Sequence, residues 1–288
     1  MIDFNHPDAM LFFPGGQGSL EQLAKTTHLG IGAHQDDLEI LAIHGILKAY
    51  DDPESNFTGV TVTDGRGAPR SGPYAHLSDD ELWQIRADEQ KKAAEIGRYN
   101  AQFLLNYPSS VIKSSERGTA VQDLKNIISL TQPEVIYTHN LTDKHDTHNA
   151  VTLCTIQALR ELEPKENETT LYGCEVWRGL DWLPDDRKIS LDVSNHPKLQ
   201  TELLSIFDSQ IAGGKRYDEA TMGRRLANAT YLQSHETDTA NLVVYAADLT
   251  PLIKDPTMDI TSYALADIYA LADDVRSRLE RLSVKSEI

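Results

Sequence analysis

The sequence predicts an α/β fold of Rossmann-like type: a mostly parallel sheet with helices on both faces and a helical addition at the C-terminal end. Two observations predict this fold. Apolar, β-branched runs alternate with amphipathic helical patterns over the first two thirds of the chain, an order typical of parallel sheets. Polar runs with His, Asp and Gly follow several of the predicted strands, as expected at the carboxyl edge of such a sheet, where ligands bind.

The elements follow from local patterns. Residues 1–25 contain several prolines and glycines, and we expect an irregular arm with a short helix at 19–24. Apolar and β-branched runs predict strands at 27–33, 58–63, 101–106, 133–138, 171–177 and 188–192. Helical spacing of apolar residues, with end signals such as Ser78 before an acidic turn, predicts the helices. These are 38–50, 78–97, 120–130, 149–162, 197–211, 216–232 and 261–284.

The chain of 288 residues is expected to form a single α/β domain, because this length is enough for one good core. The last predicted helix, 261–284, is long and amphipathic. We expect it either to pack on the body or to mediate self-association, which leaves a homo-oligomer open.

Composition excludes several classes of partner. The net charge of −17 argues against nucleic acid and anionic membrane surfaces, because no broad basic face is available for phosphates. The N-terminal residues lack the basic flank and apolar core of a signal peptide, and no apolar run reaches membrane-spanning length. The two cysteines, Cys154 and Cys174, are expected to be buried thiols. We expect a cytoplasmic protein that acts on a small molecule.

The strand predicted at 27–33 ends directly before His34, Asp36 and Asp37, and a helix follows. This order places the three side chains at the carboxyl edge of the sheet. His34 and Asp37 can converge because the chain turns between them, and Asp36 is then free to act as a base. A simpler interpretation stays open, in which Asp36 or Asp37 only caps the helix.

A second cluster follows the strand predicted at 133–138. It contains His139, His145, Asp146 and His148. If the two strands are neighbours, both clusters open onto one crevice. Two imidazoles and one carboxylate, with one position left for water, form a catalytic zinc site. The two clusters together predict a metal centre.

Two motifs carry a resemblance to a known family. Residues 33–37, Ala-His-Gln-Asp-Asp, resemble the AHPDDE signature of the LmbE/PIG-L family of zinc-dependent N-acetylglucosaminyl deacetylases, with Gln for Pro and the acid displaced to Glu39. Residues 145–148, His-Asp-Thr-His, resemble its HPDH signature. The resemblance covers about 27–212 and leaves 213–288 as a C-terminal extension.

The resemblance implies a role for each matching residue. His34, Asp37 and His148 would bind zinc, Asp36 would be the general base, and His145 would be the cation that steadies the oxyanion and helps the amine leave. The implied reaction removes the acetyl group from an N-acetylated amino sugar or glycoside by attack of an activated water. Other divalent metals stay open, as does another small amide or a thiol conjugate as substrate.

One acid of the family pattern is absent. The carboxylate that family members place just before the last ligand is Thr147 here. Asp143 and Asp146 are the candidates that would orient and charge His145 in its place. Some relatives have a tyrosine at the position of Asp143.

Substrate contacts are expected from Arg66 and Arg70, in the Gly- and Pro-rich loop after the strand at 58–63. Their forked donors could hold sugar hydroxyls or an acidic group; solvated loop arginines are the simpler interpretation. Trp177 and Trp182 could stack on a sugar, but we expect both to pack in the core.

Three other classes fit less well. His34 and Asp36 with a distal histidine also form the ligand pattern of non-haem iron oxygenases, but those are β-barrels, whereas each cluster here leads into a helix. Gly30 begins a partial dinucleotide-binding fingerprint, in which Gln35 stands at the third glycine. A His-Asp pair at 145–146 also occurs in HD phosphohydrolases, which are helical.

Overall fold

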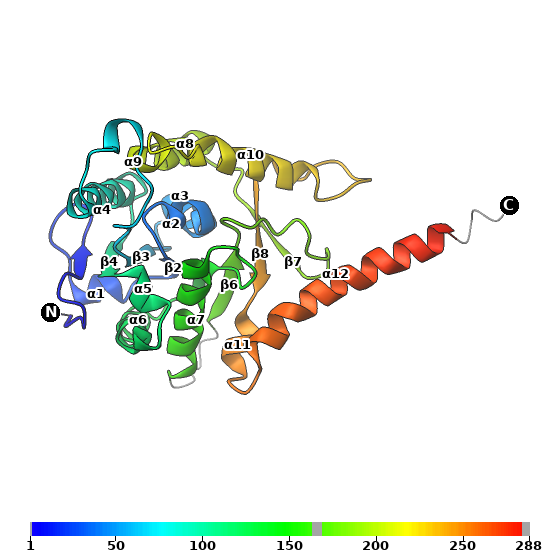
Figure 1. Cartoon of the computed structure of the whole chain (residues 1–288), viewed down its shortest axis with the longest axis horizontal. Coiled ribbons are helices and arrows are strands. Elements are labelled where there is room, and N and C mark those ends of the chain that lie inside the picture. Colours follow the sequence, from blue (N-terminus) through cyan, green and yellow to red (C-terminus); the bar gives the residue numbers. More distant parts are fainter. Residues whose placement is uncertain (1, 163–168, 284–288) are drawn as a thin grey trace.

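The computed structural model describes residues 2–162 and 169–283, and these form one sheet with the strand order β1-β4-β3-β2-β5-β6-β8-β7 (Figure 1). The strands are β1 (Met10–Phe12), β2 (His28–Gly32), β3 (Phe57–Thr63), β4 (Ala101–Tyr107), β5 (Val135–His139), β6 (Thr170–Cys174), β7 (Lys188–Asp192) and β8 (Val243–Asp248). The five central strands from β4 to β6 are parallel, whereas β1 and β8 run antiparallel to their neighbours. The predicted mostly parallel α/β sheet is confirmed.

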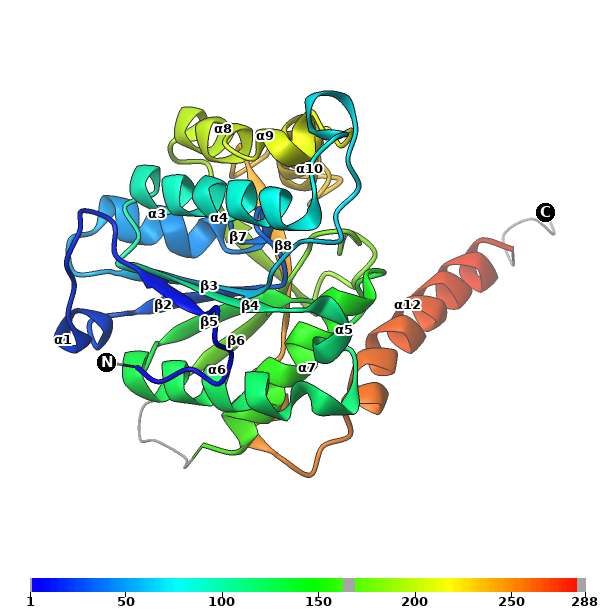
Figure 2. The same cartoon turned by 60° about the vertical axis from the view of Figure 1, so that its left-hand side comes forward.

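Helices cover both faces of the sheet (Figure 2). They are α1 (Leu20–Leu23), α2 (Asp37–Leu41), α3 (Ile43–Asp51), α4 (Asp79–Ile96), α5 (Ser109–Ile112), α6 (Gly118–Thr131), α7 (Asp146–Arg160), α8 (Pro197–Ser205), α9 (Asp208–Ile211), α10 (Tyr217–Thr230), α11 (Thr250–Lys254) and α12 (Ile260–Ser283). One core cluster packs α6 and α7 against the sheet, and a second packs α2, α3 and α8 against its other face. No helix in the described part of the chain is long and apolar enough to cross a bilayer.

Local chemistry explains why two of these elements form where they do. Ser78 caps α4: its hydroxyl accepts from the backbone N–H of Glu81 at 3.3 Å, and the Glu81 carboxylate accepts from the backbone N–H of Ser78 at 2.8 Å. Gly30 in β2 lets α2 pack closely on the sheet, because an added Cβ would lie 3.0 Å from Cδ2 of Leu38 in that helix. That close packing brings α2 directly onto the end of β2, where the first cluster lies.

The structure differs from the sequence-based elements at several places. β1 falls in the expected irregular arm, because its three residues gain their order from pairing with β4. β8 lies in a segment with no predicted strand and inserts antiparallel between β6 and β7, so the C-terminal extension also contributes to the sheet. The helix expected at 38–50 is divided at Ala42, whose φ of −107° and ψ of 12° are not helical, and the one expected at 197–211 is divided between α8 and α9.

Candidate metal centre

Both polar clusters lie at one edge of the sheet because β2 and β5 are parallel neighbours. Their register pairs His28 with Val135 and Gly30 with Tyr137. The chain leaves β2 into the turn before α2 and leaves β5 into the loop before α7. Residues far apart in the sequence therefore meet at the carboxyl ends of two adjacent strands.

The turn after β2 brings His34 and Asp37 together and separates Asp36 from them. Asp36 adopts a left-handed backbone conformation with φ of +98°. The backbone N–H of His34 donates to Oδ2 of Asp37 at 2.7 Å, and the backbone N–H of Asp37 lies 3.4 Å from the carbonyl oxygen of His34. The turn is closed by its own polar groups, so the histidine and the carboxylate three residues later share one side of it.

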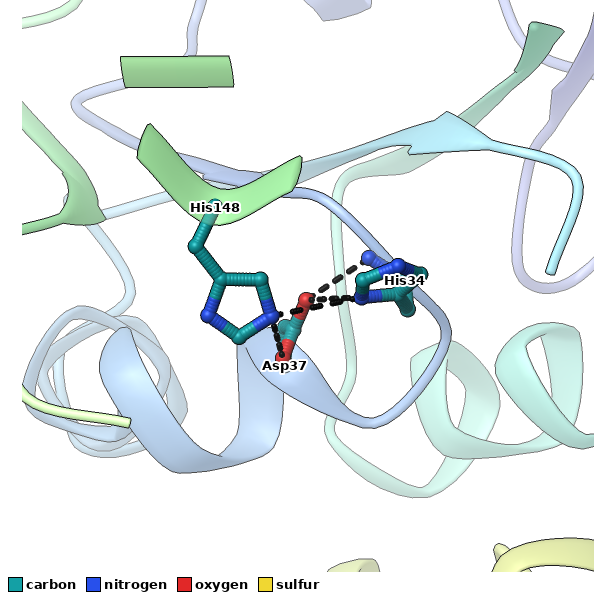
Figure 3. Close-up of side chains that lie close together, drawn as sticks. All are labelled: His34, Asp37 and His148. Atoms are coloured by element: carbon teal, nitrogen blue, oxygen red, sulfur yellow. Dashed lines mark hydrogen bonds and ion pairs between the residues drawn. The ribbon is translucent and has the colours of Figure 1, made fainter. Parts of the chain in front are cut away.

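Three potential ligand atoms converge at this turn (Figure 3). Nδ1 of His34 lies 3.3 Å from Oδ2 of Asp37, and Nε2 of His148 lies 3.5 Å from Oδ1 of Asp37. The two imidazole nitrogens are 3.3 Å apart. Two imidazoles and one carboxylate form a donor set that suits a divalent transition metal such as zinc, with a further position left for a non-protein ligand.

Asp143 and His139 lie behind these three residues. Oδ2 of Asp143 lies 3.3 Å from Nδ1 of His148, the ring nitrogen that faces away from the converging atoms. His139 stacks on His148 with ring centroids 3.8 Å apart, and its Nε2 accepts from the backbone N–H of Ala33 at 2.9 Å. Nδ1 of His139 is buried and has no hydrogen-bond partner within the described part of the chain. His139, Asp143 and His148 thus form a second potential ligand set that shares His148 with the first.

Burial sets the protonation of this cluster. It lowers the pKa of His34 to about 4, although Asp37 opposes the change, and it lowers the pKa of His139 well below its usual range. Burial alone would raise the pKa of Asp37, but His148, His139 and the hydrogen bond with His34 outweigh it and hold that pKa well below its usual range. Neutral His34 and His139 beside an ionised Asp37 are in the state that metal binding requires.

Asp36 lies beside the converging atoms but does not contribute to them. Burial, followed by the charge of Asp37, raises its pKa well above the usual range, and the Arg86 guanidinium opposes this shift. Nη2 of Arg86 lies 3.8 Å from Oδ1 of Asp36. Arg86 is itself buried and donates to the carbonyl oxygens of Gly65 and Gln35. Asp36 is therefore a buried carboxyl with an elevated pKa and one fixed cation nearby, an arrangement common at catalytic sites.

His145 completes the ring cluster. Its ring centroid lies 5.0 Å from that of His34 and 4.5 Å from that of His148. Burial, followed by His148, lowers its pKa, so the ring is mainly neutral at pH 7, whereas the family resemblance implies a cation. Asp143 contacts His145 only through its backbone N–H, at 3.1 Å, and Asp146 is exposed. Within residues 2–162 and 169–283, no carboxylate forms an ion pair with the His145 ring.

A cavity of about 500 Å³ opens over the cluster. Its lining includes Asp36, His145, Trp177, Tyr217 and Lys215. The rings of Trp177 and Tyr217 pack edge to face with their centroids 6.1 Å apart. Nζ of Lys215 lies 5.1 Å from the centroid of the Trp177 ring. Trp177 is partly buried against the second core cluster, as expected, and it also lines the cavity, because β6 ends at Cys174 and the next residues turn into the cavity wall.

Arg66 and Arg70 are not among the residues that line this cavity. Arg66 pairs with Asp64 and Asp80, each at 3.1 Å, and Arg70 pairs with Asp79. These ion pairs hold the loop in place, one within the loop and two with residues at the start of α4. Their role in substrate binding stays a prediction.

Local sequence patterns do not reveal the contacts of three residues of the site. Arg86 lies within α4, and its distance to Asp36 depends on how that helix packs. Asp143 was considered for His145, whereas its side chain contacts His148. Tyr217 lies far along the chain, at the start of α10, and no local signal links it to the cavity.

Comparison with known proteins gives the family of this fold. Residues 29–159 match the family model described as PIG-L, GlcNAc-PI de-N-acetylase. The solved N,N′-diacetylchitobiose deacetylase from Pyrococcus horikoshii is 16% identical with a TM-score of 0.64, over 85% of this chain and 92% of its own. The A40926 pseudoaglycone deacetylase Dbv21 is 17% identical with a TM-score of 0.56, over 78% and 97%.

A third structure with this fold has another activity in its title. The 4-carboxy-2-hydroxymuconate hydratase GalB from Pseudomonas putida KT2440 is 14% identical with a TM-score of 0.60, over 78% of this chain and 96% of its own. No protein of curated function matches the sequence. The matched residues 29–159 begin in β2 and end in α7, so they contain both halves of the metal centre. Residues 29–159 of the chain therefore match the PIG-L family model, and the fold is shared with solved structures titled as deacetylases.

Proposed function

We propose that this chain is a metal-dependent hydrolase that removes the acetyl group from an N-acetylated amino sugar or glycoside. The observation that carries the proposal is the convergence of His34, Asp37 and His148 beside the buried carboxyl of Asp36, below a cavity of about 500 Å³. The family domain supports the reaction class, as do two structural neighbours that are named as deacetylases.

His34, Asp37 and His148 would hold the metal ion, zinc in the first instance. When bound there, zinc would lower the pKa of a water ligand to about 7 and polarise an amide carbonyl. Asp143 keeps the His148 ring oriented from behind, since its carboxylate lies against Nδ1 and leaves Nε2 free. The same carboxylate accepts from the backbone N–H of Trp177 at 3.1 Å. Asp143 thus connects His148 to the cavity wall.

Asp36 would take a proton from the attacking water and return it to the departing amine. A carboxyl with a raised pKa suits both steps, because proton transfer is most effective when the pKa of the group lies near the working pH. Arg86 keeps the ionised form of Asp36 accessible, since its charge opposes the effect of burial. One residue can thus serve as base and then as acid.

His145 would donate a ring N–H to the oxyanion that forms at the acetyl carbon. It lies on the rim of the cluster, lines the cavity and is mainly neutral at pH 7. A neutral imidazole still provides one donor, and a donor of this kind is worth about 3 kcal/mol in the transition state. His145 therefore needs no charge of its own to contribute.

The cavity wall favours a substrate with a flat or ring-shaped face. Trp177 and Tyr217 present aromatic rings there, and Lys215 adds a donor close to the Trp177 ring. Aromatic faces pack well on the apolar face of a sugar ring while polar neighbours reach its hydroxyls. A sugar carrying the N-acetyl group fits this combination.

The test is acetate release by the zinc-loaded chain from a panel that includes N,N′-diacetylchitobiose, N-acetylglucosamine and N-acetylglucosaminides. Wild type should release acetate from at least one of these. Asp36→Asn should keep its zinc and lose about 10²- to 10⁴-fold in rate, the range expected for a missing proton-transfer group. Asp146→Asn is the matched control, because Asp146 is exposed and lies outside the cavity lining.

Two results would contradict the proposal. If zinc-loaded wild type releases acetate from no member of the panel, the N-acetyl sugar assignment fails, and other small amides or a hydration reaction become the candidates. If Asp36→Asn is as fast as wild type, Asp36 is not the base. An equal loss in Asp146→Asn would show that the effect is not specific to the cluster.

A further inference from the structure

The last helix, α12, carries an apolar seam with coiled-coil spacing. The seam residues recur at alternating steps of three and four: Leu265, Ile268, Ala272, Val275, Leu279 and Leu282. This is the spacing at which one helix packs along another. One core position of the heptad is held by Leu265, Ala272 and Leu279. The other is held by Ile268, Val275 and Leu282. None of these residues is buried in the single chain.

The seam is separate from the contacts that hold α12 on the body. Those contacts lie near the start of the helix: the hydroxyl of Tyr263 donates to the carbonyl oxygen of Asp248 at 2.6 Å, and Asp267 pairs with Arg187 at 2.7 Å. Beyond them the helix runs outward from the body, as both views show (Figures 1 and 2). Exposure of the large seam side chains rises along the helix, from 37% at Leu265 to 61% at Leu282.

A groove of about 640 Å³ lies between the first half of α12 and the body. Leu265, Ile268 and Leu271 form its α12 side, and Leu141, Leu153 and Trp182 belong to its body side. Thr142, Asp143, Asn149 and Arg178 also line the groove, so its body side is mixed, and the beginning of the seam faces into it. A partly apolar groove continuous with an exposed apolar seam is typical of a site that receives a helix.

We propose that two copies of this chain associate through antiparallel pairing of their α12 helices. In the register that pairs every seam position, Leu265 faces the second copy's Leu282, Ile268 faces the second copy's Leu279, and Ala272 faces the second copy's Val275. The outer half of each helix, which has no apolar cover of its own, then fills the groove at the base of the other. The arrangement is isologous, so it closes as a dimer.

Charge favours the antiparallel direction over the parallel one. The outer half of α12, residues 273–283, carries three arginines and three acidic side chains and so has no net charge, whereas the whole chain has a net charge of −17. Antiparallel pairing places this neutral half against the acidic body of the other copy and keeps the two bodies apart. Parallel pairing would place the two acidic bodies side by side.

The area is sufficient for a specific contact. Five large aliphatic side chains of the seam and Tyr269 are each between about one third and two thirds exposed. Covering them in both copies removes on the order of 1,000 Å² from water, about the lower limit for a specific interface. The arginines next to the seam add no uncompensated charge, because Arg276 and Arg278 pair with Asp273 and Asp274 at 2.9 and 2.7 Å.

Sedimentation velocity of the full chain tests the proposal at about 50 μM, above the micromolar Kd that a minimal interface supports. Wild type should be a dimer. Leu279→Glu should weaken the dimer at least about 100-fold, because a charged side chain would be buried against Ile268 of the second copy. Ser277→Glu is the matched control, since position 277 lies on the opposite side of the helix from the seam, and it should leave the dimer intact. Both variants should keep the secondary structure of wild type by circular dichroism, as neither side chain packs in a core cluster.

Cysteine cross-linking tests the direction. A mixture of Leu265→Cys and Leu282→Cys proteins should form a disulfide-linked dimer under oxidising conditions, and Leu265→Cys alone should not; Cys154 and Cys174 are buried. A monomeric wild type, a dimer that survives Leu279→Glu, or equal disruption by Ser277→Glu would overturn the proposal. Cross-linking of Leu265→Cys to itself would overturn antiparallel pairing. These results are independent of acetate release.

Discussion

Oδ2 of Asp143 lies 3.3 Å from Nδ1 of His148, while Nε2 of the same ring lies 3.5 Å from Oδ1 of Asp37. The two ring nitrogens therefore have different neighbours. A carboxylate against Nδ1 favours the tautomer with its proton on Nδ1, which leaves the lone pair of Nε2 free to bind metal. Asp143 also accepts from the backbone N–H groups of His145 and Trp177, so its position is fixed by the loop around it.

The first prediction concerns this pair. Asp143→Asn should lower zinc affinity by about 10- to 100-fold, because an amide neither orients the ring nor raises its basicity as a carboxylate does. The measurement is a competition titration with a coloured chelator. Asp146→Asn serves as control, since that side chain is exposed. Unchanged affinity in Asp143→Asn would show that the contact does not support the ligand.

The second prediction distinguishes the two ligand sets that share His148. His34→Ala should lower zinc affinity by more than about 100-fold, beyond the range for residues that only orient a ligand. His139→Gln should change it far less, because Nε2 of His139 is already engaged by the backbone N–H of Ala33 and glutamine can keep that acceptor. Metal content after dialysis checks both variants. The reverse order would assign the ion to His139, Asp143 and His148.

The third prediction concerns the cation beside Asp36. Arg86 lowers the pKa of Asp36 against the effect of burial, so its removal should raise that pKa further. Asp36 must be ionised to accept a proton. In Arg86→Gln the acidic limb of the pH profile of kcat/KM should therefore move to higher pH by about one unit. Arg66→Gln is the control, because Arg66 pairs with Asp64 and Asp80 instead. If the acidic limb of the pH profile does not move in Arg86→Gln, Arg86 does not set the pKa of the base Asp36.

The fourth prediction concerns stability. Burial lowers the pKa of His44 from 6.5 to about 4, and its Nδ1 lies 2.8 Å from the hydroxyl of Tyr137. The unfolded chain binds a proton here more readily, so His44 contributes stability above pH 6.5 that is lost as the pH falls toward 4. Between pH 8 and pH 5, wild type should lose about 2 kcal/mol more unfolding free energy than His44→Asn.

Urea unfolding at the two pH values measures this difference. Asparagine keeps a polar atom near the position of Nδ1, so the hydrogen bond to Tyr137 can persist. His76→Asn is the control, because His76 is exposed. Equal pH slopes for wild type and His44→Asn would contradict the assignment.

Much of the fold and half of the metal centre could be predicted because their signals are local. His34 and Asp37 are three residues apart, so the turn alone brings them together. The parallel strands are rich in apolar and β-branched residues, which a local pattern reveals. β1 could not be predicted in this way, since three residues become a strand only by pairing with β4.

The remaining site residues depend on tertiary packing. Arg66 forms ion pairs with Asp64 and Asp80, and Arg70 forms one with Asp79. The pairs at the start of α4 depend on the position of that helix, which the sequence does not give. Trp177 faces the cavity because β6 ends three residues earlier than its apolar pattern does. The neutral state of His145 likewise follows from burial beside His148, which no spacing encodes.

The most direct test of the central claim is a zinc titration of the metal-free chain, in which bound metal and acetate release from N,N′-diacetylchitobiose are followed together. Acetate release should rise in proportion to bound zinc and level off at about one ion per chain, as expected for one ligand set with a single open position. His148→Ala should bind zinc weakly and release little acetate. Full acetate release from the metal-free chain, or from His148→Ala without bound metal, would contradict the account.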